Sequence, residues 1–302
     1  MAKVRLAGVP EQVNIPVQLC IEHGIFIKHG VEVEWVLVPE GTGKMIQMLE
    51  SGEVDVALTV SDALMVGVAS GRAVRLVGTF VESPLVWAVA TSPAHHAAGL
   101  TLEGLAAQKK ASTTGFRFGV SRLGSGSHTM AHYASSLHGI DDPTFVVANN
   151  IAGLAAGAQR EDFDAFLWET FTTKPLFDSG ELHKLDEVST PWTAFSVAAG
   201  SALRGDADKE AAVRDRLFPA LAEGCRLFVA DPAAAADRIV HEFGHQPGDA
   251  AAWLACVRYN DARALQLDRA KTADSVAILQ QIGLISADFS VDALWQGSAV
   301  VN

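Results

Sequence analysis

Residues 124–128, with the sequence Gly-Ser-Gly-Ser-His, form the segment of this chain best suited to binding an anion. They follow an expected strand and open an expected helix. Backbone N–H groups at a helix start, together with hydroxyl groups, suit a carboxylate, sulfonate or phosphate. The plainer interpretation is that Ser125 or Ser127 caps the helix while the glycines ease the turn. Arg122, just upstream, would either add a charge-assisted hydrogen bond or lie in solvent.

A second group of polar and aromatic residues follows the expected strand at residues 163–167. Trp168 could stack on a planar ligand, and Glu169 could accept hydrogen bonds from an amino or ammonium group. The alternative is a core tryptophan beside an exposed acid. Together with Glu11 and Asp62, Glu169 would make the site partly acidic, which fits a zwitterionic or amino-bearing solute better than nitrate.

Two histidine patterns resemble metal sites, but neither has a full set of ligands. Residues 241–245 spell H-E-x-x-H, the spacing of zinc proteases, yet a glycine and a proline end the helix there and no His or Glu follows. His128 and His132 are four positions apart on one helix face; a zinc pair is one interpretation, and an ordinary surface pair is favoured. The three scattered cysteines have neither a zinc spacing nor a disulfide pattern. We therefore expect no metal and no cofactor.

The elements that must position these residues alternate between strands and helices. Strands are expected at residues 4–10, 31–39, 54–60 and 74–80, with helices at 12–29, 43–51 and 62–70. Such alternation predicts βαβ units and a mainly parallel sheet flanked by helices. From residue 208 onward the pattern is helical and alanine-rich, with helices expected at 209–230, 232–243, 249–264 and 271–282.

This α/β pattern occurs twice. A His-Gly pair stands at residues 29–30 and again at 138–139, and each is followed at the same distance by an aspartate, Asp55 or Asp164. Strand, helix, His-Gly turn, strand, helix and strand recur in the same order. We therefore expect two similar lobes joined by two crossings of the chain. Lobe 1 would comprise residues 1–91 and 192–302, and lobe 2 residues 92–191.

Composition excludes several classes of protein. Of the 302 residues, 49% are hydrophobic, which excludes a disordered chain, and no apolar run is long enough for a membrane helix. The net charge of −12 argues against nucleic acid as a partner. The first residues enter a strand directly and lack the features of a secretory signal. As written, the protein is expected in the cytoplasm, or in the periplasm if the sequence was trimmed.

Two segments, residues 41–62 and the stretch FGVSRLGSGSHTM at residues 118–130, resemble type II periplasmic-binding-protein folds. The chain is most similar to the group that includes nitrate-, sulfonate- and taurine-binding proteins and the thiamine-pyrimidine synthases and binders, and the resemblance covers essentially its whole length. It implies two lobes that close over a small solute in a cleft, with contacts from loops at the carboxyl ends of the strands. Carried over onto this sequence, the ligand-binding positions are Pro10, Glu11, Gln12, Thr59, Ser61, Asp62 and Phe80 in lobe 1, and Arg122, Ser125, Gly126, Ser127, His128, Asn149, Trp168 and Glu169 in lobe 2.

The favoured interpretation is a non-catalytic protein that binds an anionic or zwitterionic solute and has a membrane transporter or another protein as its partner. No clustered nucleophile, metal set or cofactor lysine is recognisable, so catalysis is the less favoured alternative. An enzyme on the same scaffold would resemble thiamine-pyrimidine synthases, whose cysteine-rich iron motif is absent here, or menaquinone-pathway enzymes. In the second case His128 could act as a base. An intracellular ligand sensor is the third interpretation.

Overall fold

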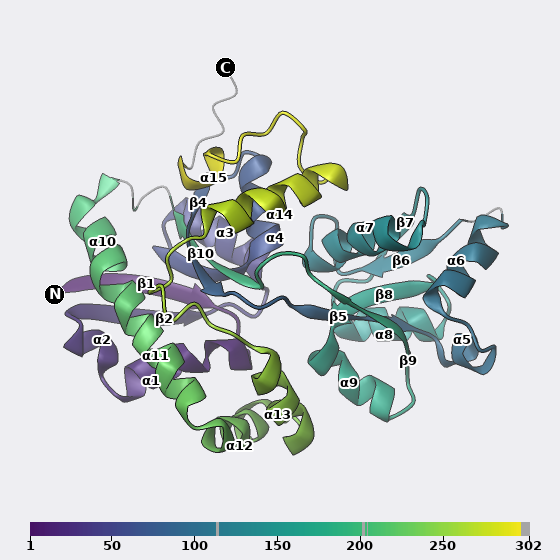
Figure 1. Cartoon of the computed structure of the whole chain (residues 1–302), viewed down its shortest axis with the longest axis horizontal. Helices are drawn as coiled ribbons and strands as arrows, with labels where there is room; N and C mark the ends of the chain where they lie inside the picture. The colour runs from purple at the N-terminus through teal and green to yellow at the C-terminus, as the bar shows by residue number, and fades with distance from the viewer. Residues whose placement is uncertain (113–114, 201–202, 204, 297–302) are drawn as a thin grey trace. The chain divides into compact units, whose positions relative to one another are not determined.

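The chain folds into two compact units, each built around its own sheet (Figure 1). The structure is a computed structural model that describes all residues except 113–114, 201–202, 204 and 297–302. Unit 1 comprises residues 1–84 and 192–302, and unit 2 comprises residues 85–191.

Unit 1 has a five-stranded sheet in the order β2-β1-β3-β10-β4. β1 pairs in parallel with β2 and β3, whereas β10 pairs antiparallel with β3 and β4. β10 therefore runs against the other four strands, and the sheet is mainly parallel, as predicted. Its strands are β1 (Ala2–Gly8), β2 (Val31–Leu37), β3 (Val56–Val60), β4 (Val74–Val81) and β10 (Phe195–Gly200).

The helices of unit 1 cover this sheet and continue into the carboxyl-terminal part of the chain (Figure 1). A short π-helical turn, η3, joins α10 to α11. The helical elements are η1 (Gln12–Asn14), α1 (Ile15–Glu22), α2 (Ile25–Lys28), α3 (Thr42–Ser51), α4 (Ser61–Ala69), α10 (Ala207–Ala212), η3 (Val213–Leu217), α11 (Phe218–Ala230), α12 (Pro232–Phe243), α13 (Pro247–Cys256), α14 (Arg269–Gln281) and α15 (Ala293–Gln296).

Two of the helices expected in unit 1 are interrupted. The helix expected at residues 12–29 is split because Gly24 adopts a left-handed conformation with φ of 63°. The helix expected at 249–264 ends at Cys256, so that prediction was wrong beyond this residue. The chain there becomes extended and Tyr259 forms an isolated bridge with Val81, while its hydroxyl donates a buried hydrogen bond of 3.0 Å to the Val13 carbonyl. These long-range contacts override the local helical pattern.

Unit 2 repeats the arrangement with the strand order β7-β6-β8-β5-β9. β6 pairs in parallel with β7 and β8, and β5 runs antiparallel to β8 and β9. The strands are β5 (Val86–Thr91), β6 (Arg117–Val120), β7 (Thr144–Val147), β8 (Ala165–Glu169) and β9 (His183–Ser189). The helices are α5 (Pro93–Ala97), α6 (Leu102–Lys110), α7 (Gly126–His138), α8 (Ile151–Gln159) and α9 (Thr170–Asp178).

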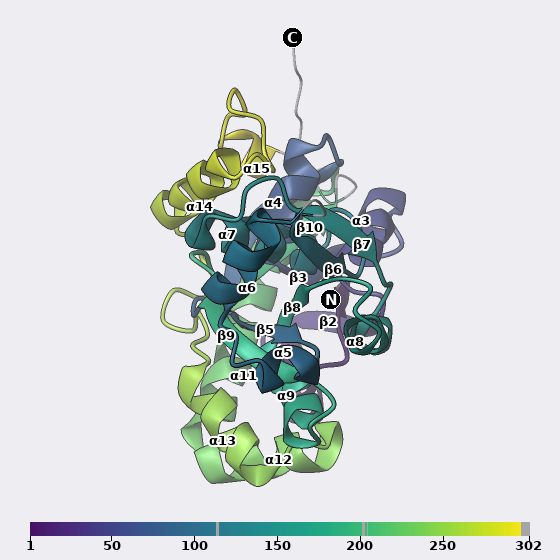
Figure 2. The same ribbon diagram turned by 90° about the vertical axis from the view of Figure 1, so that its right-hand side faces the viewer.

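The helices of unit 2 lie on both sides of its sheet, with α6 and α7 on one side and α8 and α9 on the other (Figure 2). On the second side, the apolar cluster includes Leu154 of α8 together with Phe163 and Phe166. Phe163 packs so closely on Gly119 and Gly157 that a Cβ at either glycine would lie 2.5 Å from its ring. These two glycines let α8 and β6 approach the same aromatic ring.

The strand that runs against its neighbours comes, in each unit, from a crossing of the chain. β5 follows β4 of unit 1 directly but is the fourth strand of the unit 2 sheet. The boundary expected at residue 91 would have left β5 in lobe 1, whereas the structure divides the chain between residues 84 and 85. The second division falls between residues 191 and 192.

Candidate functional site

In unit 1, the predicted binding residues lie where β1, β3 and β4 end. The carboxyl ends of strands that run the same way meet at one edge of a sheet, so these residues share an edge. Pro10 and Glu11 are exposed after β1. Asp62 lies in the first turn of α4, where the helix dipole favours a negative charge. The remaining residues of the group, like Asp62, are buried: Gln12, Thr59, Ser61 and Phe80.

Three of the buried residues in unit 1 have contacts inside the protein. The hydroxyl of Ser61 lies 2.7 Å from that of Ser196, and the hydroxyl of Thr59 donates to the Ser196 carbonyl at 3.4 Å. Phe80 is fully buried, with its ring 5.3 Å from that of Tyr259. These contacts are enough to explain why the three residues are buried in unit 1. Contact with a ligand stays a prediction for them.

In unit 2, the loop between β6 and α7 is held together by its own serines. Ser125 is the N-cap of α7; its hydroxyl donates to the Arg122 carbonyl at 2.7 Å and accepts from the His128 N–H at 3.4 Å. The Ser127 hydroxyl accepts from the Ser121 N–H at 2.9 Å. The serine side chains therefore shape the loop, as the capping interpretation predicted.

The hydrogen-bond donors of this loop that lack a partner within the helix are backbone groups. The first N–H groups of an α-helix have no partner within the helix, and here they belong to Gly126 and Ser127. α7 has 13 residues, long enough to place the positive end of a helix dipole at this point. The side chain of Arg122 is exposed beside it. This combination of N–H donors and positive potential suits an anionic group.

His128 is neutral at pH 7 and bonded on both ring nitrogens. Burial, and then the neighbouring His132, lower the pKa of His128 to about 4. Its Nδ1 accepts from the Gly124 N–H at 3.2 Å, and its Nε2 lies 3.3 Å from Nε2 of His132. Because Nδ1 acts as acceptor, the ring proton of neutral His128 belongs on Nε2, from which it can be donated to His132. Both rings are half-buried and pack against Phe145, and the choice between an ordinary pair and a zinc pair stays a prediction.

Glu169 and Trp168 stand at the end of β8. Glu169 is the N-cap of α9, and its Oε2 accepts from the N–H of Thr172 at 2.7 Å and from its hydroxyl at 2.8 Å. Burial raises the pKa of this carboxyl, although the bonds from Thr172 oppose the shift. Trp168 is half-buried against the apolar cluster that contains Phe166. Asn149, after β7, is exposed with φ of 68°.

Comparison with known proteins identifies this architecture. Residues 87–188 match the family described as Ca3427-like PBP, and residues 13–95 match the family described as NMT1/THI5 like. The product of the Candida albicans CA3427 gene, whose structure exhibits the generic periplasmic binding protein fold, superposes with a TM-score of 0.84 at 27% identity, over 98% of this chain and 94% of that one. This chain has the periplasmic-binding-protein fold.

Two other structures with this fold are more distant in sequence. The periplasmic aliphatic sulphonate binding protein SsuA from Escherichia coli is 16% identical, with a TM-score of 0.68 over 98% of this chain and 92% of that one. The periplasmic nitrate-binding protein NrtA from Synechocystis PCC 6803 is 13% identical, with a TM-score of 0.69 over 97% and 85%. No curated protein matches the sequence. The fold class and the family resemblance predicted above are confirmed.

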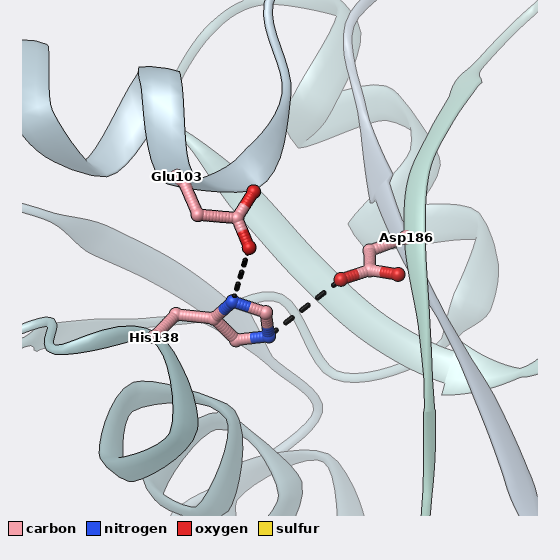
Figure 3. A group of neighbouring side chains, drawn as sticks. All are labelled: Glu103, His138 and Asp186. Carbon is pink, nitrogen blue, oxygen red and sulfur yellow. Dashed lines mark hydrogen bonds and ion pairs between the residues drawn. The ribbon is translucent and has the colours of Figure 1, made fainter.

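Within this periplasmic-binding-protein fold, the described part of the chain has one group of three side chains that could hold a metal ion (Figure 3). His138 Nδ1 lies 2.8 Å from Glu103 Oε1, and its Nε2 lies 3.6 Å from Asp186 Oδ2. The two carboxylates therefore face opposite nitrogens of the ring, an arrangement that ties α6, α7 and β9 together. Glu103 is exposed, and such pairs contribute little to stability.

Sequence reasoning missed several polar groups at the edges of the two periplasmic-binding-protein sheets. In unit 1, Asn14 Oδ1 and Trp35 Nε1 are buried without a hydrogen-bond partner, and a Cβ on Gly8 would meet both side chains. In unit 2, Trp87 Nε1 is buried in the same way, and so is Oγ1 of Thr170, which sequence reasoning had placed with Trp168 and Glu169 at the end of a strand. The sequence placed Trp87 in a segment that crosses between the lobes. It did not show that Trp87 lies beside β8, because that position depends on the pairing of β5 with β8.

No helix within the described residues combines the length and the apolar character needed to cross a bilayer.

Proposed function

We propose that this protein is a non-catalytic solute-binding protein whose ligand is a small anion or zwitterion. The observation that carries the proposal is the start of α7, where the N–H groups of Gly126 and Ser127 follow a loop already shaped by its own serine hydroxyls. A binding site formed in advance needs little ordering when the ligand arrives. In unit 1, Glu11 and Asp62 at the ends of β1 and β3 stay the predicted ligand contacts.

The attraction for an anion would come from backbone dipoles and Arg122. His128 adds no positive charge at pH 7, because burial and His132 keep its pKa near 4. A sulfonate, carboxylate or nitrate would accept hydrogen bonds from the first turn of α7.

The acidic residues favour a ligand that also carries an amino group. Burial raises the pKa of Glu169, which means that its charged form lacks full compensation in the protein. An ammonium or amino group on the solute would supply that compensation by donating to the carboxylate. A zwitterion such as taurine fits these requirements better than nitrate does.

The proposed protein partner is a membrane transporter. Proteins of similar fold include sulphonate- and nitrate-binding proteins and a ligand-binding component of an ABC-type import system from Staphylococcus aureus, 12% identical with a TM-score of 0.71. These similarities support transport as the context of solute binding in this chain.

A thermal-shift screen tests the proposal. The panel contains taurine, ethanesulfonate, nitrate, small carboxylates, aminopyrimidines and pyridoxal phosphate. A ligand that binds only the folded protein adds about 2.7 kcal/mol at 100 times its Kd, which is enough for a clear rise in Tm. The ligand should be recovered chemically unchanged after incubation; a ligand converted to product would establish an enzyme instead.

Paired serine variants locate the site. Ser127→Ala should reduce the ligand-induced shift in Tm, since the Ser127 hydroxyl accepts from Ser121 and holds the loop at the start of α7. Ser136→Ala is the control, because the Ser136 hydroxyl bonds to the Tyr133 carbonyl in an exposed part of the same helix. No shift with any member of the panel, or equal shifts in both variants, would overturn the proposal.

A further inference from the structure

Two polar side-chain atoms at one end of the unit 2 sheet lack hydrogen-bond partners. Trp87 is 8% exposed, and its Nε1 is buried without an acceptor. The hydroxyl oxygen of Thr170 is also buried and has no hydrogen-bond partner. Nearly all buried polar atoms in native proteins are hydrogen-bonded, so each exception requires an explanation.

Strand pairing places Trp87 opposite Glu169, the residue that precedes Thr170 in the chain. Trp87 lies directly opposite Glu169 in the antiparallel pairing of β5 with β8, and directly paired residues project from the same face of a sheet. Thr170 follows Glu169 and is the first residue of α9. The rings of Trp87 and Trp168 are in edge contact, with centroids 6.4 Å apart. The unsatisfied pair therefore stands at the carboxyl end of β8, where the binding residues of unit 2 were expected.

The neighbouring polar groups already have partners within the protein. Glu169 Oε2 accepts two hydrogen bonds from Thr172, and the hydroxyl of Thr173 donates to the Glu169 carbonyl at 2.8 Å. Trp87 and Thr170 are thus exceptions in an otherwise satisfied group. An indole N–H can only donate, and a threonine hydroxyl can donate as well as accept. The indole N–H therefore needs an acceptor atom, and an acceptor would satisfy the threonine hydroxyl as well.

We propose that the Trp87 N–H and the Thr170 hydroxyl each bind an acceptor atom of the solute and so determine its specificity. The acceptor is a sulfonate or carboxylate oxygen or a ring nitrogen, and a solute that carries a donor alone at this position is rejected. This inference rests on the proposed function, because it assigns residues to the same binding site.

Two conservative substitutions test the assignment. Trp87→Phe removes the N–H and keeps an aromatic ring, while Thr170→Val removes the hydroxyl and keeps the shape. With taurine or ethanesulfonate as the probe, calorimetry should give about tenfold weaker binding in each variant, as expected for the loss of one hydrogen bond. Trp253→Phe is the matched control, since Trp253 is also 8% exposed but packs against Phe228 in unit 1, and it should bind as the wild type does.

A spectroscopic readout on the wild type does not depend on how well a variant folds. The indole ¹⁵N–¹H signal of Trp87, assigned by its absence in Trp87→Phe, should move when ethanesulfonate is titrated into the protein. Suppose a probe raises the wild-type Tm, yet both variants bind it equally and the indole signal stays in place. The inference is then overturned, buried water is the partner of the two atoms, and the proposed function stands. If no probe raises the wild-type Tm, the proposed function fails and this inference fails with it.

Discussion

A buried ion pair that is repeated in the two units allows a quantitative test of the internal repeat. Asp55, directly before β3, accepts from the Arg5 N–H at 2.8 Å, from its guanidinium at 2.8 Å and from Lys209 at 3.2 Å. Asp164, directly before β8, accepts from the Arg117 N–H at 2.7 Å and its guanidinium at 3.1 Å. Lys109 lies 2.6 Å from the same carboxylate. The two aspartates are 5% and 2% exposed.

The change proposed is Asp55→Asn, with Asp164→Asn as its counterpart in unit 2. Each substitution removes the buried negative charge and leaves two cations beside a neutral amide. Removing one partner of a buried pair costs about 3–5 kcal/mol. Arg5 and Lys209 are 33% and 27% exposed, so water compensates them in part. We therefore expect a loss of about 3 kcal/mol in the free energy of unfolding for each variant.

Urea denaturation followed by circular dichroism measures this loss, and hydrogen exchange resolved by peptide assigns it to a unit. Asp55→Asn should speed exchange in β1 and β3, and Asp164→Asn in β6 and β8. The control is Asp141→Asn, whose partner is Lys110 and where both side chains are 71% exposed; it should unfold at nearly the same urea concentration as the wild type. A loss of less than about 1 kcal/mol in the free energy of unfolding of the two buried variants would show that these ion pairs contribute little to holding the neighbouring strands together.

The pH dependence of the same variant gives an independent check. Burial acts to raise the pKa of Asp55, but the hydrogen bonds from Arg5 and the bond and charge of Lys209 outweigh it, so the pKa lies below its ordinary value. A depressed carboxyl pKa stabilises the fold at pH values above the unfolded pKa, and this contribution is lost as the pH falls through the folded pKa. The difference between wild type and Asp55→Asn should therefore shrink at acid pH.

Two further outcomes are expected. The folded-state pKa of His128 is about 4, below its ordinary value of 6.5. Between these two pH values the unfolded chain binds the proton more readily, so stability falls as the pH is lowered. His128→Gln should flatten that part of the Tm–pH profile, and an unchanged slope would contradict a lowered pKa of His128. Gly8→Ala would place a Cβ 2.3 Å from the Trp35 ring and should cost about 1–3 kcal/mol in urea denaturation. The comparison for the second variant is Gly248→Ala, where nothing lies within 4 Å of the added Cβ; equal losses would mean that the contact of Trp35 with Gly8 is not tight.

The alternation of strands and helices and the internal repeat were predictable from the sequence because hydrophobic periodicity is a local property. Asp55 and Asp164 stood at matching positions of the two copies, and both proved to anchor the same pair of strands in their units. The turn that opens α7 was recognisable for the same reason, since Gly, Ser and the helix start are adjacent in the chain.

Contacts between segments far apart in the chain were decided by the tertiary structure. β5 has an apolar pattern that would suit either sheet, and its pairing with β8 and β9 places it in unit 2. That pairing brings Trp87 opposite Glu169, residues separated by most of unit 2, and leaves the indole N–H without a partner. A local pattern predicts that a side chain will be buried. Which atoms then lack a hydrogen bond depends on every neighbour that the fold brings to it.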